Sequence, residues 1–381
     1  MADSGGGSQM SAPEIWSNTR VRSTPFTSRI EAFGVGAYTV YNHMLLPLKF
    51  VSIEDDYWHL KEHVQLWDVS VQRQVEIVGP DAARVVQLMT PRDLSKSRVG
   101  RCYYAPLTDG RGGLINDPVI LKLAEDRFWL SISDSDVALW AKGLAHGLGL
   151  AVEIFEPNVD PLAIQGPKAE ELMVRVFGER IAAIKFFGFD HIEFSGHPLL
   201  IARTGWSKQG GFEIYVDRRD LAGPIWDALT EAGSDLEVRP GCPNLIERIE
   251  GGLISYGGDA TIDDSPLQCL LEQYCHLDAD IEFIGQAALR QQRDRGLQRS
   301  LRGVFIDAPR LPSVRERWPM LLDGRPIGDL RSAVHSPHFD RGVGLAMLDR
   351  AAWASGTHLT IESPEGVLEA SVTDVPFAAA D

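Results

Sequence analysis

Three side chains that could bind one ligand lie close together between residues 203 and 216. An apolar run at residues 199–202 precedes this segment, and alternating apolar and polar residues end it. The pattern predicts two antiparallel strands joined by a polar loop with a Gly-Gly pivot. The alternation places Glu213 and Tyr215 on one face of the second strand, so a carboxylate and a phenol could meet the indole of Trp206. Taken alone, these residues fit an ordinary hairpin with one solvated face slightly better.

Asn116 and Asp117 form a second candidate group, at the predicted start of a strand. A glycine-rich turn at residues 108–113 predicts a hairpin bend, and an apolar strand at residues 119–123 follows Pro118. Turn aspartates more often accept hydrogen bonds from nearby backbone amides than act in a site. The residues alone therefore leave both interpretations of Asp117 open.

Short motifs across the chain resemble one enzyme superfamily. Residues 204–206 (Thr-Gly-Trp) followed by residues 211–214 (Gly-Phe-Glu-Ile) resemble the signature of the folate-dependent aminomethyltransferase (glycine cleavage T-protein) superfamily. Within it, several segments are similar to the dimethylsulfoniopropionate demethylases, namely residues 41–47, 185–190, 205–211 and 240–248. The resemblance runs from about Arg22 to past Arg302, and more loosely to the C-terminus, so it covers most of the chain.

The resemblance implies a tetrahydrofolate site with a nearby base. In the superfamily the glutamate at the position of Glu213 binds the pterin ring. The second aspartate of a Gly-Gly-x-x-Asp-Asp motif lies near the reactive folate nitrogen and corresponds to Asp117. Asn116 replaces the first aspartate, so one carboxylate remains to take a proton, directly or through a water. Tyr104 is a candidate stacking or hydrogen-bonding neighbour of the folate, which would be the methyl-accepting cosubstrate.

The implied methyl donor is dimethylsulfoniopropionate, and the implied products are methylmercaptopropionate and 5-methyltetrahydrofolate. The leaving group is a neutral thioether, so the enzyme must supply alignment rather than an acid or a metal. Aromatic faces can hold the sulfonium without neutralising it, and we assign Tyr41, Trp206 and Tyr215 to this role. Lys208 or Arg248 would meet the propionate carboxylate. For Arg248, a salt bridge that holds the two lobes together is an equally good alternative.

Three other functions share the resemblance. Glycine-cleavage aminomethyl transfer uses a lipoyl carrier protein, but Asn116, Asn244 and residues 206–209 depart from its pattern. A demethylase of another methylated onium compound, such as a quaternary amine, would use a similar aromatic box. The non-catalytic folate-binding factor of iron–sulfur assembly carries a lysine-glycine-cysteine-tyrosine motif, which residues 265–272 do not reproduce.

The composition of the 381 residues excludes several partners. A formal net charge of −16 argues against nucleic acid and disfavours an anionic membrane face. No apolar run approaches the roughly 20 residues that span a bilayer, and residues 1–21 predict a disordered tail without a signal peptide. Four cysteines without a Cys-x-x-Cys pair predict reduced thiols. We therefore expect a cytoplasmic protein whose partners are a small-molecule substrate and folate, with a homodimer kept open.

One short pattern suggests a metal. His59, Glu62 and His63 fit a zinc-peptidase motif on a predicted helix at residues 53–68. The surroundings are charged and no acidic ligand motif follows, so we expect a solvated helix and no metal.

The elements that position these residues contain a repeat. An alternating strand, a Gly-Pro turn and an amphipathic helix occur at residues 75–89 and again at residues 162–176, with the Gly-Pro pairs 87 residues apart. This predicts two related α+β lobes with antiparallel sheets. The first lobe would be discontinuous, at residues 22–63 and 160–290, and the second would occupy residues 64–159.

Residues 300–378 predict a third domain. Short strands separated by turns, such as Asp323-Gly324, are typical of a small antiparallel barrel, and the charged, Gln-rich residues 290–299 predict a linker to it. The predicted fold class is α+β, with two related lobes and a C-terminal antiparallel β-barrel in a cloverleaf-like arrangement of three domains.

Overall fold

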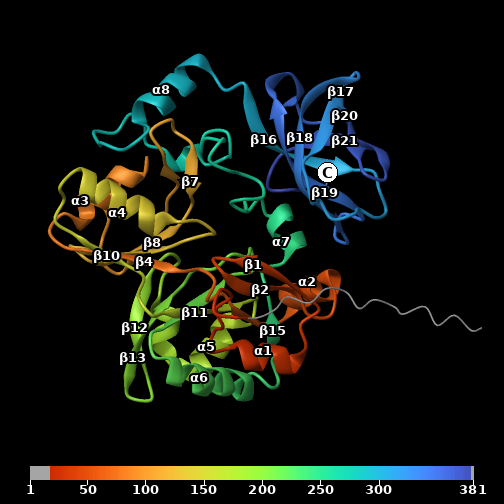
Figure 1. The fold of residues 1–381 in the computed structure, drawn as a ribbon. Helices are drawn as coiled ribbons and strands as arrows, with labels where there is room; N and C mark the ends of the chain where they lie inside the picture. The colour runs from red at the N-terminus through yellow and green to blue at the C-terminus, as the bar shows by residue number, and fades with distance from the viewer. Residues whose placement is uncertain (1–17, 379–381) are drawn as a thin grey trace, which may run out of the picture.

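The computed structural model describes residues 18–378 and shows three bodies arranged around a common centre (Figure 1). Each of the three is built on its own β-sheet. The predicted α+β fold class, with two lobes and a C-terminal barrel, is confirmed. Most of the predicted N-terminal tail, residues 1–17, lies outside the described residues.

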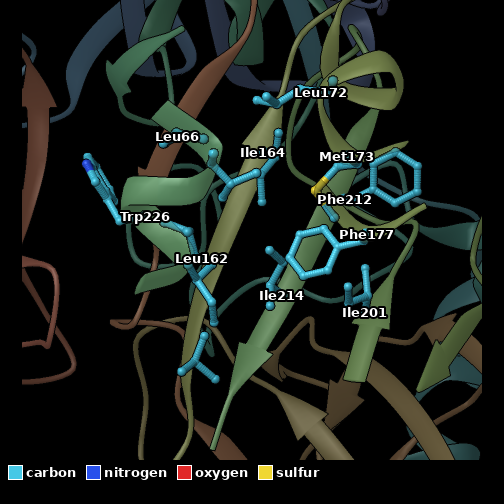
Figure 2. Close-up of a cluster of buried hydrophobic side chains, with 14 of the residues drawn as sticks. Leu66, Leu162, Ile164, Leu172, Met173, Phe177, Ile201, Phe212, Ile214 and Trp226 are labelled. Carbon is cyan, nitrogen blue, oxygen red and sulfur yellow. The ribbon is translucent and has the colours of Figure 1, made fainter. Parts of the chain in front are cut away.

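A six-stranded sheet forms the first lobe. Its order is β12 (Phe189–Phe194), β13 (His197–Ala202), β14 (Gly211–Val216), β11 (Asp160–Gln165), β3 (Gln65–Asp68) and β15 (Arg239–Gly241). All neighbours are antiparallel except β15, which runs parallel to β3. Helices α5 (Ala169–Phe177) and α6 (Arg219–Ala232) pack on one face, and Figure 2 shows the buried side chains between sheet and helices.

The hairpin predicted around the loop with the Gly-Gly pivot, residues 203–211, is confirmed. Strands β13 and β14 pair with Leu200 opposite Tyr215 and Ala202 opposite Glu213. The alternate residues Phe212 and Ile214 enter the core of the first lobe. The opposite face of β14 is buried against the second lobe rather than solvated, because Tyr215 packs in a cluster that includes strands of both sheets.

A five-stranded antiparallel sheet forms the second lobe. Its order is β10 (Glu153–Phe155), β4 (Gln74–Val78), β9 (Arg127–Ser131), β8 (Val119–Ala124) and β5 (Arg101–Tyr104). Helices α3 (Ala82–Met89) and α4 (Val137–Gly147) supply many of its core residues. We placed the start of this lobe at residue 64, but the pairing of β3 with β11 keeps residues 65–68 in the first sheet.

Both strand–Gly-Pro–helix units are present, and their glycines meet the same constraint. Gly79 and Gly166 have φ angles of 128–135°. A Cβ atom would lie 2.7 Å from the Ala151 carbonyl oxygen at the first position and 2.2 Å from the His63 carbonyl oxygen at the second. Only glycine permits this conformation and this close approach of two chain segments.

Smaller elements complete the lobes. Helices α1 (Thr27–Phe33) and α2 (Ile53–Glu62) and the hairpin of β1 (Ala37–Tyr41) and β2 (Met44–Lys49) flank the first sheet. The hairpin of β6 (Leu107–Thr108) and β7 (Leu114–Asn116) extends from the second. The helix predicted at residues 53–68 is shorter than expected because its last residues form β3.

The segment that leads to the barrel contains α7 (Leu245–Glu250) and α8 (Gln286–Arg295). We assigned residues up to 290 to the first lobe, but part of this segment contacts the second. The Leu114 amide donates to the Asp264 carbonyl at 2.8 Å, and the Thr108 hydroxyl donates to the Ile284 carbonyl at 2.6 Å. Most of the predicted linker at residues 290–299 is helical, since α8 reaches Arg295.

The third body is a closed barrel, as predicted. Its order is β16 (Arg299–Ile306), β19 (Arg341–Asp349), β18 (Arg325–Ser336), β17 (Trp318–Leu322), β20 (His358–Ser363) and β21 (Gly366–Thr373). Between residues 18 and 378, no helix is long and apolar enough to cross a membrane.

Candidate functional site

The β1–β2 hairpin carries Tyr41 to the second lobe. Asn42 and His43 form its two-residue turn with φ angles of 48° and 61°, the positive values that such tight turns require. The Asn42 side chain donates to the Ser133 carbonyl at 3.2 Å, and its backbone amide donates to Asp134 Oδ1 at 2.9 Å. These contacts fix Tyr41 beside the turn that follows β9.

Two hydroxyl groups hold Asp117 from opposite sides. Tyr104 donates to Oδ2 at 2.7 Å, and Ser133 donates to Oδ1 at 2.6 Å. The pairing of β5 with β8 places Tyr104 opposite Val119, two residues beyond Asp117. The carboxylate is therefore anchored by strands of the second lobe and by the turn that Asn42 contacts.

Ser133 is the residue of this group that the sequence did not assign to the site. Ser133 precedes α4 but does not cap it, because the helix begins at Val137 and its N-cap is Asp136, which makes no side-chain capping bond. The signal that could have identified Ser133 is its place just after β9, the strand that pairs with the one following Asp117.

Asn116 has a structural role that needs an amide. Its Oδ1 accepts from the backbone amides of Asp117 and Ser133, both at 3.0 Å. Its Nδ2 donates to the Ser135 hydroxyl at 2.8 Å and to the Ser133 carbonyl at 3.2 Å. A carboxylate could not donate these last two bonds. Asn116 therefore leaves Asp117 as the ionisable member of the pair.

Burial dominates the electrostatics around Asp117. It raises the pKa of this carboxyl to about 6, although the Ser133 and Tyr104 hydroxyls act in the opposite direction by stabilising the charged form. Burial, followed by the negative charge of Asp117, also raises the pKa values of the Tyr104 and Tyr41 phenols, so both stay protonated at neutral pH. The Asp117 carboxyl can gain or lose a proton close to neutral pH, as a general base must.

Glu213 lies at the junction of the two lobes. It is 5% exposed, and the Thr204 hydroxyl donates to its Oε2. Burial raises the pKa of the Glu213 carboxyl, with the Thr204 and Tyr215 hydroxyls opposing the effect. Among residues 18–378, Thr204 is the residue that donates to the Glu213 carboxylate at hydrogen-bonding distance. Oε1 of Glu213 therefore remains available to a ligand.

Tyr215 lies deeper than the predicted aromatic box. It is 1% exposed and its ring centroid is 5.8 Å from that of Trp129, a residue of β9. Its hydroxyl is buried near the Glu213 carboxylate, but it makes no hydrogen bond of ordinary geometry with residues 18–378. In the described part of the chain, no ring contact joins it to Tyr41 or Trp206.

Trp206 and Lys208 lie on the loop between β13 and β14. The Trp206 indole is half-buried, and within residues 18–378 it makes no ring contact and no side-chain hydrogen bond. Lys208 is exposed, while its backbone amide donates to Glu247 Oε1 at 2.9 Å. The indole is therefore free to contact a ligand.

Arg248 is engaged with the protein itself. Its Nη1 lies 2.7 Å from Oδ2 of Asp259. Asp259 is fully buried, and its Oδ1 accepts a hydrogen bond from the Ser332 hydroxyl of the barrel at 2.6 Å. This geometry favours the interpretation that Arg248 holds parts of the molecule together.

Comparisons with known proteins agree with this architecture. Residues 26–279 match the family model described as the GCVT N-terminal domain, and residues 299–378 match the glycine cleavage T-protein C-terminal barrel domain. A crystal structure of glycine cleavage system aminomethyltransferase T from Bartonella henselae covers 94% of this chain and 98% of its own chain with a TM-score of 0.84. At 22% identity, that likeness shows a shared fold.

Curated relatives extend over nearly the whole chain. The dimethylsulfoniopropionate demethylase DmdA of Ruegeria pomeroyi is 49% identical over 94% of this chain and 98% of its own length. An aminomethyltransferase of Lysinibacillus sphaericus is 30% identical over 90% of this chain and 94% of its own length. The family resemblance in the motifs is thereby confirmed, and the chain belongs to the glycine cleavage T-protein family of folate-dependent aminomethyltransferases.

Proposed function

We propose that this chain is a tetrahydrofolate-dependent demethylase that transfers a methyl group from the sulfonium of dimethylsulfoniopropionate to tetrahydrofolate. The relative from Ruegeria pomeroyi, which carries that activity in its name, supports the substrate. The observation that carries the proposal is the single carboxylate of Asp117, which Tyr104 and Ser133 hold while Asn116 occupies the neighbouring position. One base suffices when the leaving group is a neutral thioether.

The residues at the lobe junction fit a folate. Glu213 presents a buried carboxylate with one oxygen bound by Thr204 and the other without a donor at hydrogen-bonding distance among the described residues. Amino and ring N–H groups of a pterin are donors of the kind that such an oxygen needs. We assign Glu213 to pterin binding and Tyr104 to the neighbouring part of the folate site.

The reaction balances without an added acid or metal. The bond between the methyl carbon and sulfur breaks with its electron pair remaining on sulfur, and a bond between that carbon and the folate nitrogen N5 forms. Asp117, directly or through a water, takes the proton that this nitrogen releases. The products are methylmercaptopropionate and 5-methyltetrahydrofolate.

The donor side rests on aromatic groups. Trp206 offers an unpaired indole face and Tyr41 lies beside the Asp117 group, so we assign both to the sulfonium. Tyr215 stays a proposed contact, and it would need to act from a buried position. Lys208 is the exposed cation proposed for the propionate carboxylate, with Arg248 as the second proposed contact. The four free thiols agree with the cytoplasmic location that we also propose.

Anaerobic incubation with dimethylsulfoniopropionate and tetrahydrofolate tests the proposal. Chromatography should show methylated folate and methylmercaptopropionate in equal amounts. Both should be lost in folded Asp117→Ala protein and reduced in folded Trp206→Ala protein at a donor concentration below KM. Asp136→Ala is the matched control, because Asp136 is exposed and its side chain makes no capping bond.

If the protein binds folate but forms neither product, the demethylase assignment is wrong. Glycine betaine would then test a quaternary amine as the donor, and a lipoyl carrier protein would test aminomethyl transfer. Folate binding without turnover of any of these donors would favour a non-catalytic role.

A further inference from the structure

A buried carboxylate on α7 holds the loop that carries Trp206. Oε1 of Glu247 accepts from the Lys208 backbone amide at 2.9 Å and from the Gln209 side-chain amide at 2.8 Å. Glu247 is 2% exposed, and none of the steps derived above uses it. Hydrogen bonds to an ionised acceptor are roughly twice as strong as neutral ones.

Residues 206–209, the central part of the loop, have few other restraints. Gly205, Gly210 and Gly211 all have positive φ angles, so much of its backbone is of the permissive kind. In the middle of the loop, the Ser207 hydroxyl donates to Oε1 of Gln165 at 2.8 Å. Further bonds lie at the ends of the loop, where the Gln165 side-chain amide donates to the Thr204 carbonyl at 3.3 Å and the Gly166 amide donates to the Gly210 carbonyl at 3.1 Å. Glu247 therefore supplies two of the bonds that define where the loop lies.

A nearby cation compensates the charge of Glu247. Nζ of Lys61, on α2, lies 2.8 Å from Oε2 of Glu247. Lys61 is only partly exposed, and its Nζ also lies 5.1 Å from the centroid of the Tyr57 ring. The Lys61 ammonium therefore lies between Glu247 and Tyr57. The cation therefore lies against one oxygen of Glu247 while the other oxygen accepts both loop bonds.

We propose that Glu247 is a positioning residue that holds Trp206 in place for the methyl donor. The inference rests on the proposed function, because it assigns Trp206 to the sulfonium. Glu213 lies on β14, whose position the sheet fixes through its pairing with β11. Loss of the Glu247 contacts therefore weakens binding of the sulfonium donor and leaves binding of folate unchanged.

The test compares two glutamates on one helix. Glu247→Leu removes both loop bonds. Glu250→Leu removes a similarly buried carboxylate that contacts Tyr57, Ser336 and, at 3.9 Å, Lys61, but not the loop. Glu247→Gln retains an oxygen that can accept from the Lys208 amide. Hydrogen–deuterium exchange of residues 206–210 and the separate KM values for donor and folate are measured on the full-length proteins.

Glu247→Leu should accelerate exchange of the loop and raise KM for dimethylsulfoniopropionate by roughly tenfold each, as expected for the loss of a hydrogen bond to a charged group. KM for tetrahydrofolate should stay within about twofold, since the pterin contacts lie on the sheet. Glu250→Leu weakens the anchoring of α7 but keeps both loop bonds, so it should change loop exchange and donor KM much less than Glu247→Leu does. Glu247→Gln should restore most of the wild-type loop exchange and donor KM. If Glu247→Leu does not fold, Gln209→Ala replaces it in the test. This variant loses one loop bond and should shift loop exchange and donor KM in the same direction.

Unchanged loop exchange in Glu247→Leu would overturn the proposal, and so would accelerated exchange with an unchanged donor KM. An equal rise in both KM values would also contradict it, because that indicates general damage. If the wild-type protein does not turn over dimethylsulfoniopropionate, the proposed function fails and the donor role fails with it. The exchange experiment needs no substrate, so it still reports separately whether Glu247 holds the loop.

Discussion

Replacing Asp117 with asparagine is expected to stabilise the protein at neutral pH while abolishing turnover. The carboxyl is held by Tyr104 and Ser133, but burial raises its pKa to about 6 from the ordinary 3.8. The ionised form is therefore less favourable in the folded protein than in the unfolded chain. Asparagine fills the same space and can bond both hydroxyls without carrying a charge.

The magnitude follows from the two pKa values. One pKa unit corresponds to about 1.4 kcal/mol, so a rise from 3.8 to about 6 corresponds to about 3 kcal/mol. Well below pH 3.8 the carboxyl is protonated in the folded and the unfolded state, so it contributes no difference in stability. As the pH rises from 3.8 to about 6, Asp117 ionises in the unfolded chain while it stays protonated in the folded protein. The free energy of unfolding of the wild-type protein therefore falls over this range. The stability advantage of Asp117→Asn should thus grow from near zero well below pH 3.8 to about 3 kcal/mol above pH 6.

Urea denaturation of both proteins at a series of pH values measures this difference directly. At each pH, the free energy of unfolding of the wild type is subtracted from that of the variant. The change of this difference with pH reports on Asp117, because the other titrating groups contribute equally to both proteins. If asparagine is equally destabilising at pH 4 and pH 7, burial does not disfavour the Asp117 charge and the assignment of this residue as a poised base fails.

Three further changes probe the same site. Tyr104→Phe removes a donor to ionised Asp117, so the pKa of that carboxyl should rise and the acidic limb of the pH profile of kcat/KM should move above about 6; an unmoved limb would contradict this. Trp206→Ala should raise KM for the sulfonium donor roughly 3- to 30-fold without lowering the melting temperature, as the loss of one aromatic face predicts, and initial rates at varied donor concentration check it. Asn116→Asp replaces an amide donor to Ser133 with a carboxylate, so it should destabilise the fold by about 2 kcal/mol at pH 8 and by less at pH 5; a stability loss that does not depend on pH would argue against it.

The predictable parts of this fold have local causes. The alternation in β14 correctly separates Phe212 and Ile214 from Glu213, because each residue of a strand faces opposite its neighbour. The Gly-Pro turns were visible because a positive φ angle selects glycine at both positions. The barrel strands were recognisable by their turns.

The parts that were missed depend on distant pairing. Strand β3 follows α2 directly, and only its ladder with β11 assigns it to the first sheet. A serine shortly before a helix is typical of a helix cap, whereas the bond of Ser133 to Asp117 spans 16 residues and has no local signal. Nothing local in the sequence distinguishes Glu247 from the neighbouring Glu250, although one contacts the loop and the other contacts the barrel.

The short helix α7 shows why the barrel belongs to the working protein. Six residues make a helix too short to be stable by itself, and the acidic side chains of this one are buried, so neighbouring parts must fix it. Glu250 accepts from Tyr57 of α2 and from Ser336 of the barrel, at 2.8 and 2.6 Å. The same helix presents Glu247 to the Trp206 loop one turn earlier. Docking of the barrel therefore stabilises the helix that positions a donor contact, even though the site itself lies on the two lobes.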